Sequence, residues 1–166
     1  NDKNNSPIIL VNGVGIHGFK EPVDILNCGN SGTTTRLISG ALAGRDFISV
    51  LSGDNSLNSR PMGRIIQPLS QMGANIYGRK NNTFAPLIFT GGLLKSIDYI
   101  MPVASAQIKS CIILAALRAS GPTNIIQKAI SRDHSERMLL AMGSKISQND
   151  LNICIEPSEL DSIDVE

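Results

Sequence analysis

A run of small and polar residues, Gly29 to Arg36, directly precedes a segment with the apolar spacing of a helix. The first backbone N–H groups of a helix have no partner within it, and the helix dipole places about half a positive charge at that end. A phosphate or a carboxylate is therefore a natural ligand of this turn. Simple N-capping by Ser31 or Thr33 accounts for the same residues without a ligand. No Gly-Lys-Ser/Thr sequence follows, so the run does not match a P-loop.

Two arginines occupy equivalent places in the chain. Arg60 stands in Ser59–Pro61 and Arg132 in Ser131–Asp133, each just before a helix-like run. A guanidinium in that place can form two parallel hydrogen bonds to a phosphate or a carboxylate. A single arginine before a helix is more often solvated or paired with a neighbouring acid. Two in register, together with the run from Gly29 to Arg36, favour a site for anions.

The stretch Ser105 to Lys109 opens another predicted helix, with Ser105 as its cap. Ser105 can cap the helix without any ligand. In that case Gln107 and Lys109 are ordinary exposed residues of the first turn. His134 follows Arg132 closely and could act as a base, but a histidine at a helix start is more often structural. These residues alone therefore leave the structural and the functional interpretation open.

The segment Gly13 to Gly18 matches the GxGxxG pattern of dinucleotide-binding folds. In those folds a helix begins at the pattern, and its amino end holds the pyrophosphate. Here Phe19 to Pro22 and then Val23 to Leu26 follow, and neither stretch has a helical pattern. We expect a glycine-rich hairpin at this place and no nucleotide site.

The elements that must position these residues form an internal repeat with a spacing of about 70 residues. In each unit a predicted helix ends at a glycine and a β-rich run follows it. The predicted helices are residues 34–43 and 108–119, the β-rich runs are 47–51 and 123–126, and strands at 7–10 and 86–89 close one unit before the next begins.

Each unit thus has the order strand, helix, strand, helix, strand, strand, which places the chain in the α/β (α+β) class. Ile108 to Leu117 and Met138 to Met142 are apolar over much of the helix circumference. A helix with that pattern is usually buried. We therefore expect repeated βαβαββ units with buried helices and outer sheets.

Composition excludes several classes of function. The chain has 166 residues, 42% of them hydrophobic, which suits one domain with a core. A net charge of +1 and 4% aromatic residues without tryptophan argue against a nucleic-acid partner. No apolar run approaches the roughly 18 residues of a membrane-spanning helix. Cys28, Cys111 and Cys154 lack metal-ligand spacing, so we expect no metal, and scattered thiols fit the cytoplasm.

Taken together, the motifs resemble one family, the 5-enolpyruvylshikimate-3-phosphate synthases. The resemblance runs from about Val23 to Ile146 and rests on five motifs in the family's order. These are Gly29 to Arg36, Gly53-Asp54 with Ser56-Leu57, Arg60-Pro61-Met62, Pro102 to Gln107, and Ser131 to Glu136. The family's domains are each built from three βαβαββ units with buried helices, an enolpyruvyl transferase-like fold that agrees with the repeat.

The resemblance implies transfer of the enolpyruvyl group of phosphoenolpyruvate to shikimate 3-phosphate, a step of the shikimate pathway that leads to chorismate and the aromatic amino acids. It implies addition and elimination through a tetrahedral intermediate, with no cofactor and no metal. The small anionic substrates are the expected partners. By position, Ser105, Ala106, Gln107 and Arg132 would bind shikimate 3-phosphate, Gly32, Thr33, Arg60 and Gln107 would bind phosphoenolpyruvate, and Asn30 and Arg36 would support the site.

The same resemblance implies that glyphosate competes with phosphoenolpyruvate near Gly32. Tolerant members carry alanine at the matching place, so we expect a glyphosate-sensitive enzyme.

Two parts of the family pattern have no match in this chain. The early Ser-Lys-Ser motif, with its catalytic lysine, is not found before Val23, and nothing matches the carboxyl-terminal domain that supplies the acid/base carboxylate. We therefore expect residues 1–166 to be an incomplete amino-terminal domain, with about two of three units, no catalytic residue of its own, and a missing second domain as its partner. Two alternatives stay open: UDP-N-acetylglucosamine enolpyruvyl transferase, whose reactive-cysteine loop is not evident here, and a non-catalytic anion-binding module on the same scaffold.

Overall fold

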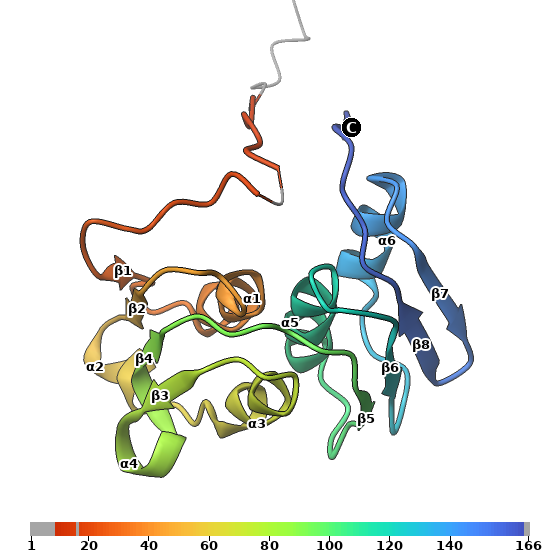
Figure 1. Cartoon of the computed structure of the whole chain (residues 1–166). Coiled ribbons are helices and arrows are strands. Elements are labelled where there is room, and N and C mark those ends of the chain that lie inside the picture. The colour runs from red at the N-terminus through yellow and green to blue at the C-terminus, as the bar shows by residue number, and fades with distance from the viewer. Residues whose placement is uncertain (1–8, 16, 165–166) are drawn as a thin grey trace, which may run out of the picture.

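The computed structural model describes residues 9–15 and 17–164, which form two consecutive units of helices and strands (Figure 1). The first unit contains β1 (Leu26–Asn27), α1 (Gly32–Leu42), β2 (Ser49–Ser52), α2 (Asn55–Asn58), α3 (Gly63–Gln71), β3 (Ile76–Gly78), α4 (Arg79–Asn82) and β4 (Phe84–Phe89). The second contains β5 (Asp98–Ile100), α5 (Ala106–Ala116), β6 (Thr123–Ile126), α6 (His134–Ala141), β7 (Ile146–Asn149) and β8 (Asn152–Ile155).

The two units build their sheets in the same way. One four-stranded sheet has the order β1-β2-β4-β3 and the other β5-β6-β8-β7. In each, the first two strands pair in parallel and the other pairs are antiparallel, with Leu26 opposite Leu51 and Tyr99 opposite Ile125. A parallel pair needs a crossover connection, and α1 and α5 supply it. The repeat predicted from the sequence is thus present in the structure.

Helices α1, α3 and α5 lie between the two sheets (Figure 1). Helix α5 is the most apolar of them, and Cys111, Ile112 and Ile113 at its middle are fully buried. The backbones of α1 and α5 come very close at Gly40, where an added Cβ would stand 2.1 Å from the carbonyl oxygen of Cys111. Only glycine permits this approach. The buried helices with outer sheets that we expected are found for this central group.

The structure corrects the expectation that residues 138–142 belong to a buried helix. The α6 side chains at Met138 and Leu140 are about half exposed, at 53% and 49%, while Leu139 and Glu136 are buried. The apolar residues of α6 are consecutive, so they cannot all face one neighbour at 100° per residue. The helix therefore buries only one narrow side against α5 and β7.

Two other expectations near the start of the chain need correction. Ile9 and Leu10, the described part of the predicted strand 7–10, are not in a strand, and residues 7–8 lie outside the described residues. The described part of the glycine-rich segment contains a turn, in which Gly18 N–H donates to the carbonyl of Gly15 at 3.3 Å, and the described residues next to it are not in strands. Turn residues were recognised correctly, but strands need a partner that the sequence pattern does not reveal.

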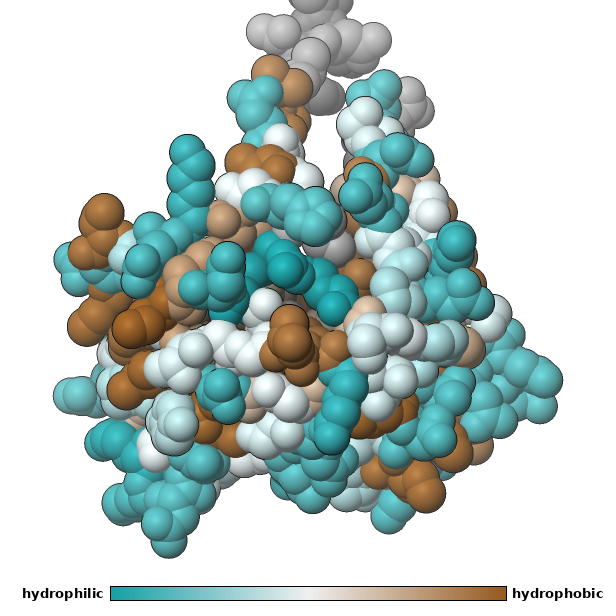
Figure 2. Space-filling model, viewed as in Figure 1, coloured by the Kyte–Doolittle hydropathy of each residue, from teal (hydrophilic) through white to brown (hydrophobic). Residues whose placement is uncertain are grey.

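The surface seen in Figure 2 carries hydrophobic side chains in separate groups among hydrophilic ones. Exposed hydrophobic side chains on strands whose other face is buried include Tyr77, Ile88 and Ile100. Among the described residues, no helix has the length and apolar character needed to cross a membrane.

Candidate functional site

The first turn of α1 presents backbone N–H groups outward. Ser31 caps the helix, since its Oγ accepts hydrogen bonds from the N–H of Thr34 at 3.0 Å and from the hydroxyl of Thr34 at 2.7 Å. In the described part of the chain, no hydrogen bond uses the N–H of Gly32 or of Thr33. The cap predicted from the sequence is present, and it leaves two N–H groups for another acceptor.

Arg60 reaches this turn from the segment before α3. Its Nη2 donates to the amide oxygen of Asn30 and, at 3.3 Å, to the hydroxyl of Ser56. A Cβ added to Gly32 would stand 3.2 Å from Nη1 of Arg60 and 3.5 Å from Nη1 of Arg36. Both guanidinium groups therefore lie against the start of α1, where the absence of a side chain on Gly32 leaves room for them.

Asp54 holds Asn30 in place, and Asn30 in turn binds Arg60. The carboxylate of Asp54 accepts the N–H of Leu57 at 2.8 Å as the cap of α2, and the amide nitrogen of Asn30 donates to it at 2.7 Å. These two hydrogen bonds, with the positive charge of Arg60 nearby, lower the pKa of the Asp54 carboxyl. The chain of contacts Asp54–Asn30–Arg60 orients the guanidinium and gives Asn30 the supporting place that we expected.

Gln107 joins the two units. Its amide oxygen accepts from Nη1 of Arg36 on α1, and its amide nitrogen donates to the hydroxyl of Thr33 at 2.7 Å. The bridge spans more than 70 residues of sequence, and Gln107 itself lies in the first turn of α5. The sequence alone gave Gln107 an ordinary exposed place, whereas the fold brings it against α1.

Positive charge accumulates at this junction. Burial, followed by the charges of Arg60 and Arg64, lowers the pKa of Arg36. Arg64 lies in the first turn of α3, and its charge acts on Arg36 together with that of Arg60. Cations that are partly desolvated and close together repel one another, and a bound anion removes that repulsion.

The start of α5 repeats the arrangement of α1. Ser105 caps it, with its Oγ 3.4 Å from the N–H of Ile108, and no hydrogen bond uses the N–H of Ala106 or Gln107 within the described ranges. Arg132 lies exposed just before α6 and makes no hydrogen bond or ion pair among the residues described. The structure therefore gathers Gly32, Thr33, Arg36, Arg60, Asn30 and Gln107, and leaves Arg132 apart from them.

Comparison with known proteins assigns the chain. A family model described as EPSP synthase (3-phosphoshikimate 1-carboxyvinyltransferase) matches residues 2–166. The chain belongs to the EPSP synthase family. It is 53% identical over 159 residues to a 3-phosphoshikimate 1-carboxyvinyltransferase of Thermodesulfovibrio yellowstonii, covering 95% of this chain and 37% of the relative. It is 52% identical to one from Synechococcus elongatus, covering 94% of this chain and 36% of the relative.

Solved structures agree with the family assignment. An EPSP synthase from Acinetobacter baumannii superposes with a TM-score of 0.88 at 45% identity, over 90% of this chain and 34% of that one. A second structure of EPSP synthase from the same organism gives 0.85 at 46% identity. The α/β fold of repeated units is thereby confirmed. The chain spans about a third of the length of the curated relatives it matches.

Three features of the site were missed by the sequence analysis. The capping role of Asp54 was not predicted, although an acid after a strand can be the cap of a short helix. Arg64 was not singled out, although its spacing from Arg60 was visible in the sequence. Lys109 and Glu136 form a buried ion pair that the sequence did not predict, because a lysine in a first turn is exposed by default. The described residues contain no cluster of three or more side chains of the types that ligate metals.

Proposed function

We propose that this chain forms the part of a 3-phosphoshikimate 1-carboxyvinyltransferase that binds both anionic substrates. The observation that carries the proposal is the junction of α1 and α5, where Gln107 bridges the units beside the guanidinium groups of Arg36 and Arg60. Fixed cations and free helix N–H groups suit a reaction in which both substrates are anionic and charge shifts in the transition state.

On the phosphoenolpyruvate side, the N–H groups of Gly32 and Thr33 and the guanidinium of Arg60 are the proposed ligands. Support comes from the contact of Asn30 with Arg60, which orients that guanidinium without neutralising its charge. Arg36 acts in the proposal by holding the amide of Gln107 in place.

On the shikimate 3-phosphate side, Ser105, Ala106 and Arg132 are the proposed ligands, with Gln107 between the two substrates. The first turn of α5 offers N–H groups like those of α1, which supports a phosphate there. Arg132 would then supply charge-assisted hydrogen bonds to the same phosphate.

The reaction in this proposal is addition of the 5-hydroxyl of shikimate 3-phosphate to phosphoenolpyruvate, followed by elimination of phosphate from the tetrahedral intermediate. The residues of this chain bind and orient the substrates, and no acid/base role is assigned to them. A second domain would supply those groups. The cytoplasm is the compartment of the proposal, since a biosynthetic reaction and free thiols fit a reducing environment.

A hybrid enzyme tests the proposal. In it, this chain replaces the matched segment of the Thermodesulfovibrio yellowstonii relative, which is assayed beside it. We expect the hybrid to form phosphate and the enolpyruvyl product from the two substrates, and the isolated chain to form neither. A folded hybrid without turnover would refute the proposal and favour a non-catalytic anion-binding module. Turnover by the isolated chain would show that it carries catalytic groups we do not assign.

A further inference from the structure

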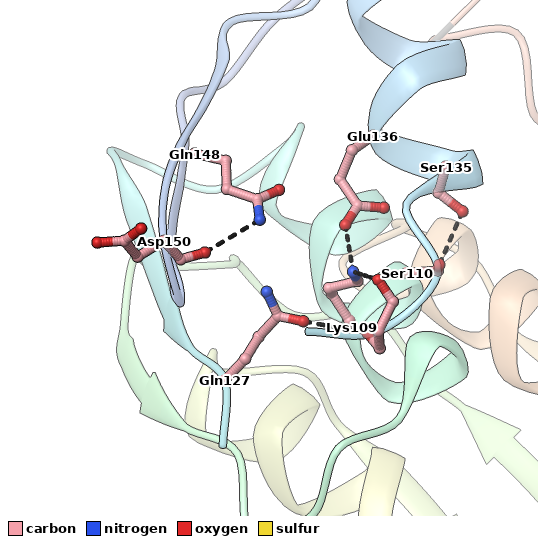
Figure 3. A network of polar contacts seen from close by, with 8 residues as sticks. Lys109, Ser110, Gln127, Ser135, Glu136, Gln148 and Asp150 are labelled. Atoms are coloured by element: carbon pink, nitrogen blue, oxygen red, sulfur yellow. Dashed lines mark hydrogen bonds and ion pairs between the residues drawn. The ribbon is translucent and has the colours of Figure 1, made fainter. Parts of the chain in front are cut away.

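Lys109 on α5 and Glu136 on α6 form an ion pair inside the second unit (Figure 3). Nζ of Lys109 lies 2.5 Å from Oε1 of Glu136, and the two side chains are only 1% and 4% exposed. Within the described residues, the second carboxylate oxygen, Oε2, has no hydrogen-bond partner. Taking two charges out of water is unfavourable, and such a pair is often no more stabilising than apolar side chains of the same size. Stability alone therefore does not explain the pair.

Further hydrogen bonds surround the ion pair, and they involve residues on both sides of Arg132 in the sequence. Nζ of Lys109 also donates to the carbonyl of Ser131 at 3.4 Å. The hydroxyls of Ser110 and Ser135 are 2.7 Å apart, and the hydroxyl of Ser131 donates to Gln127 at 3.0 Å (Figure 3). The segment before and after Arg132 is thus attached to α5 and to the end of β6.

The first unit holds its equivalent arginine differently. There Asn30 and Ser56 bind the guanidinium of Arg60 directly. Arg132 has no such side-chain contact in the described part of the chain, and its backbone segment is held instead.

The first unit also has different residues at the positions equivalent to Lys109 and Glu136. Lys109 is the fourth residue after the cap Ser105, as Thr35 is after the cap Ser31. Glu136 is the fourth residue after Arg132, as the exposed Arg64 is after Arg60. Thr35 and Arg64 cannot form such an ion pair, so the first unit has none at the matching positions.

We propose that the Lys109–Glu136 pair is a positioning device that sets Arg132 against the start of α5. Lys109 belongs to the first turns of the helix that Ser105 caps, so its contacts to Ser131 and Glu136 fix the distance between that helix start and the arginine. The inference rests on the proposed function, in which Ser105 and Arg132 bind one phosphate. Neither Lys109 nor Glu136 touches substrate in this account.

The test uses the hybrid enzyme with the variants Glu136→Gln, Lys109→Met and the double variant Lys109→Met/Glu136→Met. Each single variant leaves a buried group without its partner, so we expect a lower melting temperature. We also expect the KM for shikimate 3-phosphate to rise by about tenfold, while the KM for phosphoenolpyruvate changes by less than about twofold. The double variant should regain the melting temperature, since two apolar side chains fill the space, but it should keep the raised KM for shikimate 3-phosphate.

The control is Ile155→Ala, a fully buried residue of β8 that pairs with Thr123 and takes no part in the hydrogen bonds of Ser131 and Ser135 described above. It should lower the melting temperature without changing either KM. If the single variants raise both KM values equally, or if the double variant regains its affinity for shikimate 3-phosphate, the pair serves only stability and the inference is wrong. Should Glu136→Gln fail to fold, the double variant gives the same decision.

One more variant distinguishes a failure of this inference from a failure of the proposed function on which it rests. Arg132→Ala in the hybrid must itself raise the KM for shikimate 3-phosphate. If it does not, the proposed role of Arg132 fails and the inference falls with it. If Arg132→Ala has its effect and the ion-pair variants have none, only the inference is overturned.

Discussion

Gly32 lies where two guanidinium groups meet the start of α1, and a methyl group there would touch Arg60 at 3.2 Å. Gly32→Ala should therefore displace this guanidinium by a few tenths of an ångström. We expect the KM for phosphoenolpyruvate to rise about fivefold, which corresponds to about 1 kcal/mol.

The resemblance to the family adds a second expectation for Gly32→Ala: the inhibition constant of glyphosate should rise by a larger factor, because that inhibitor reaches further toward the glycine. Steady-state inhibition of the hybrid gives both constants. Equal proportional changes would mean that the methyl disturbs the shared anion site without discriminating between the two ligands.

Cys111 differs from the other cysteines because it lies at the contact of α1 and α5. Burial raises the pKa of its thiol to about 12. The reactive form is the thiolate, so the thiol should resist alkylation in the folded protein at pH 8. Peptide mapping after iodoacetamide treatment of the hybrid should find Cys111 modified only in denaturant, while the partly exposed Cys28 and Cys154 react in the native state. Native labelling of Cys111 at the rate of Cys154 would show that the helix contact opens readily.

The thiol of Cys111 also makes the folding stability depend on pH. The folded state keeps the Cys111 proton above the ordinary pKa of 9.0, where the unfolded chain releases it. Folding stability from this group is therefore complete below about pH 9 and declines from there to about pH 12.

At the scale of elements, the contact of α1 with α5 depends on Gly40. Gly40→Ala would place a methyl 2.1 Å from a backbone oxygen that cannot move without its helix. Overpacking of this kind costs about 3 kcal/mol or more, so we expect a large fall in the melting temperature of the hybrid. Gly63→Ala is the matched control, since the nearest atom to its new methyl is the carbonyl oxygen of Asn82 at 3.7 Å. A harmless Gly40→Ala would contradict the close packing of the two helices.

Local signals predicted the elements well. The cap Ser105 was expected, and Ser31 was one of two candidate caps with Thr33, because capping depends on residues that are close in sequence. Strand β6 has the predicted bounds of Thr123–Ile126. The exposed side of α6 was not predicted, since burial depends on which neighbours the fold supplies.

Contacts across the chain were harder to predict. Asn30 meets Asp54 and Arg60 across 24 and 30 residues, and Gln107 meets Thr33 across 74. No periodicity encodes such distances, so the candidate residues could be named from their types and from the family resemblance, but their mutual support could not.

At the scale of the whole molecule, two similar units carry one arginine each, and the central claim is that they bind different substrates. Arg60 is proposed for phosphoenolpyruvate and Arg132 for shikimate 3-phosphate. Loss of a hydrogen bond to a charged group costs roughly 1.5–3 kcal/mol, or on the order of tenfold to a hundredfold in affinity.

The most direct test is the pair of KM values for both substrates in the hybrid carrying Arg60→Ala or Arg132→Ala. The account predicts that Arg132→Ala raises the KM for shikimate 3-phosphate by about tenfold to a hundredfold and that for phosphoenolpyruvate much less, and that Arg60→Ala does the reverse. The same pattern of KM changes from both substitutions would contradict it.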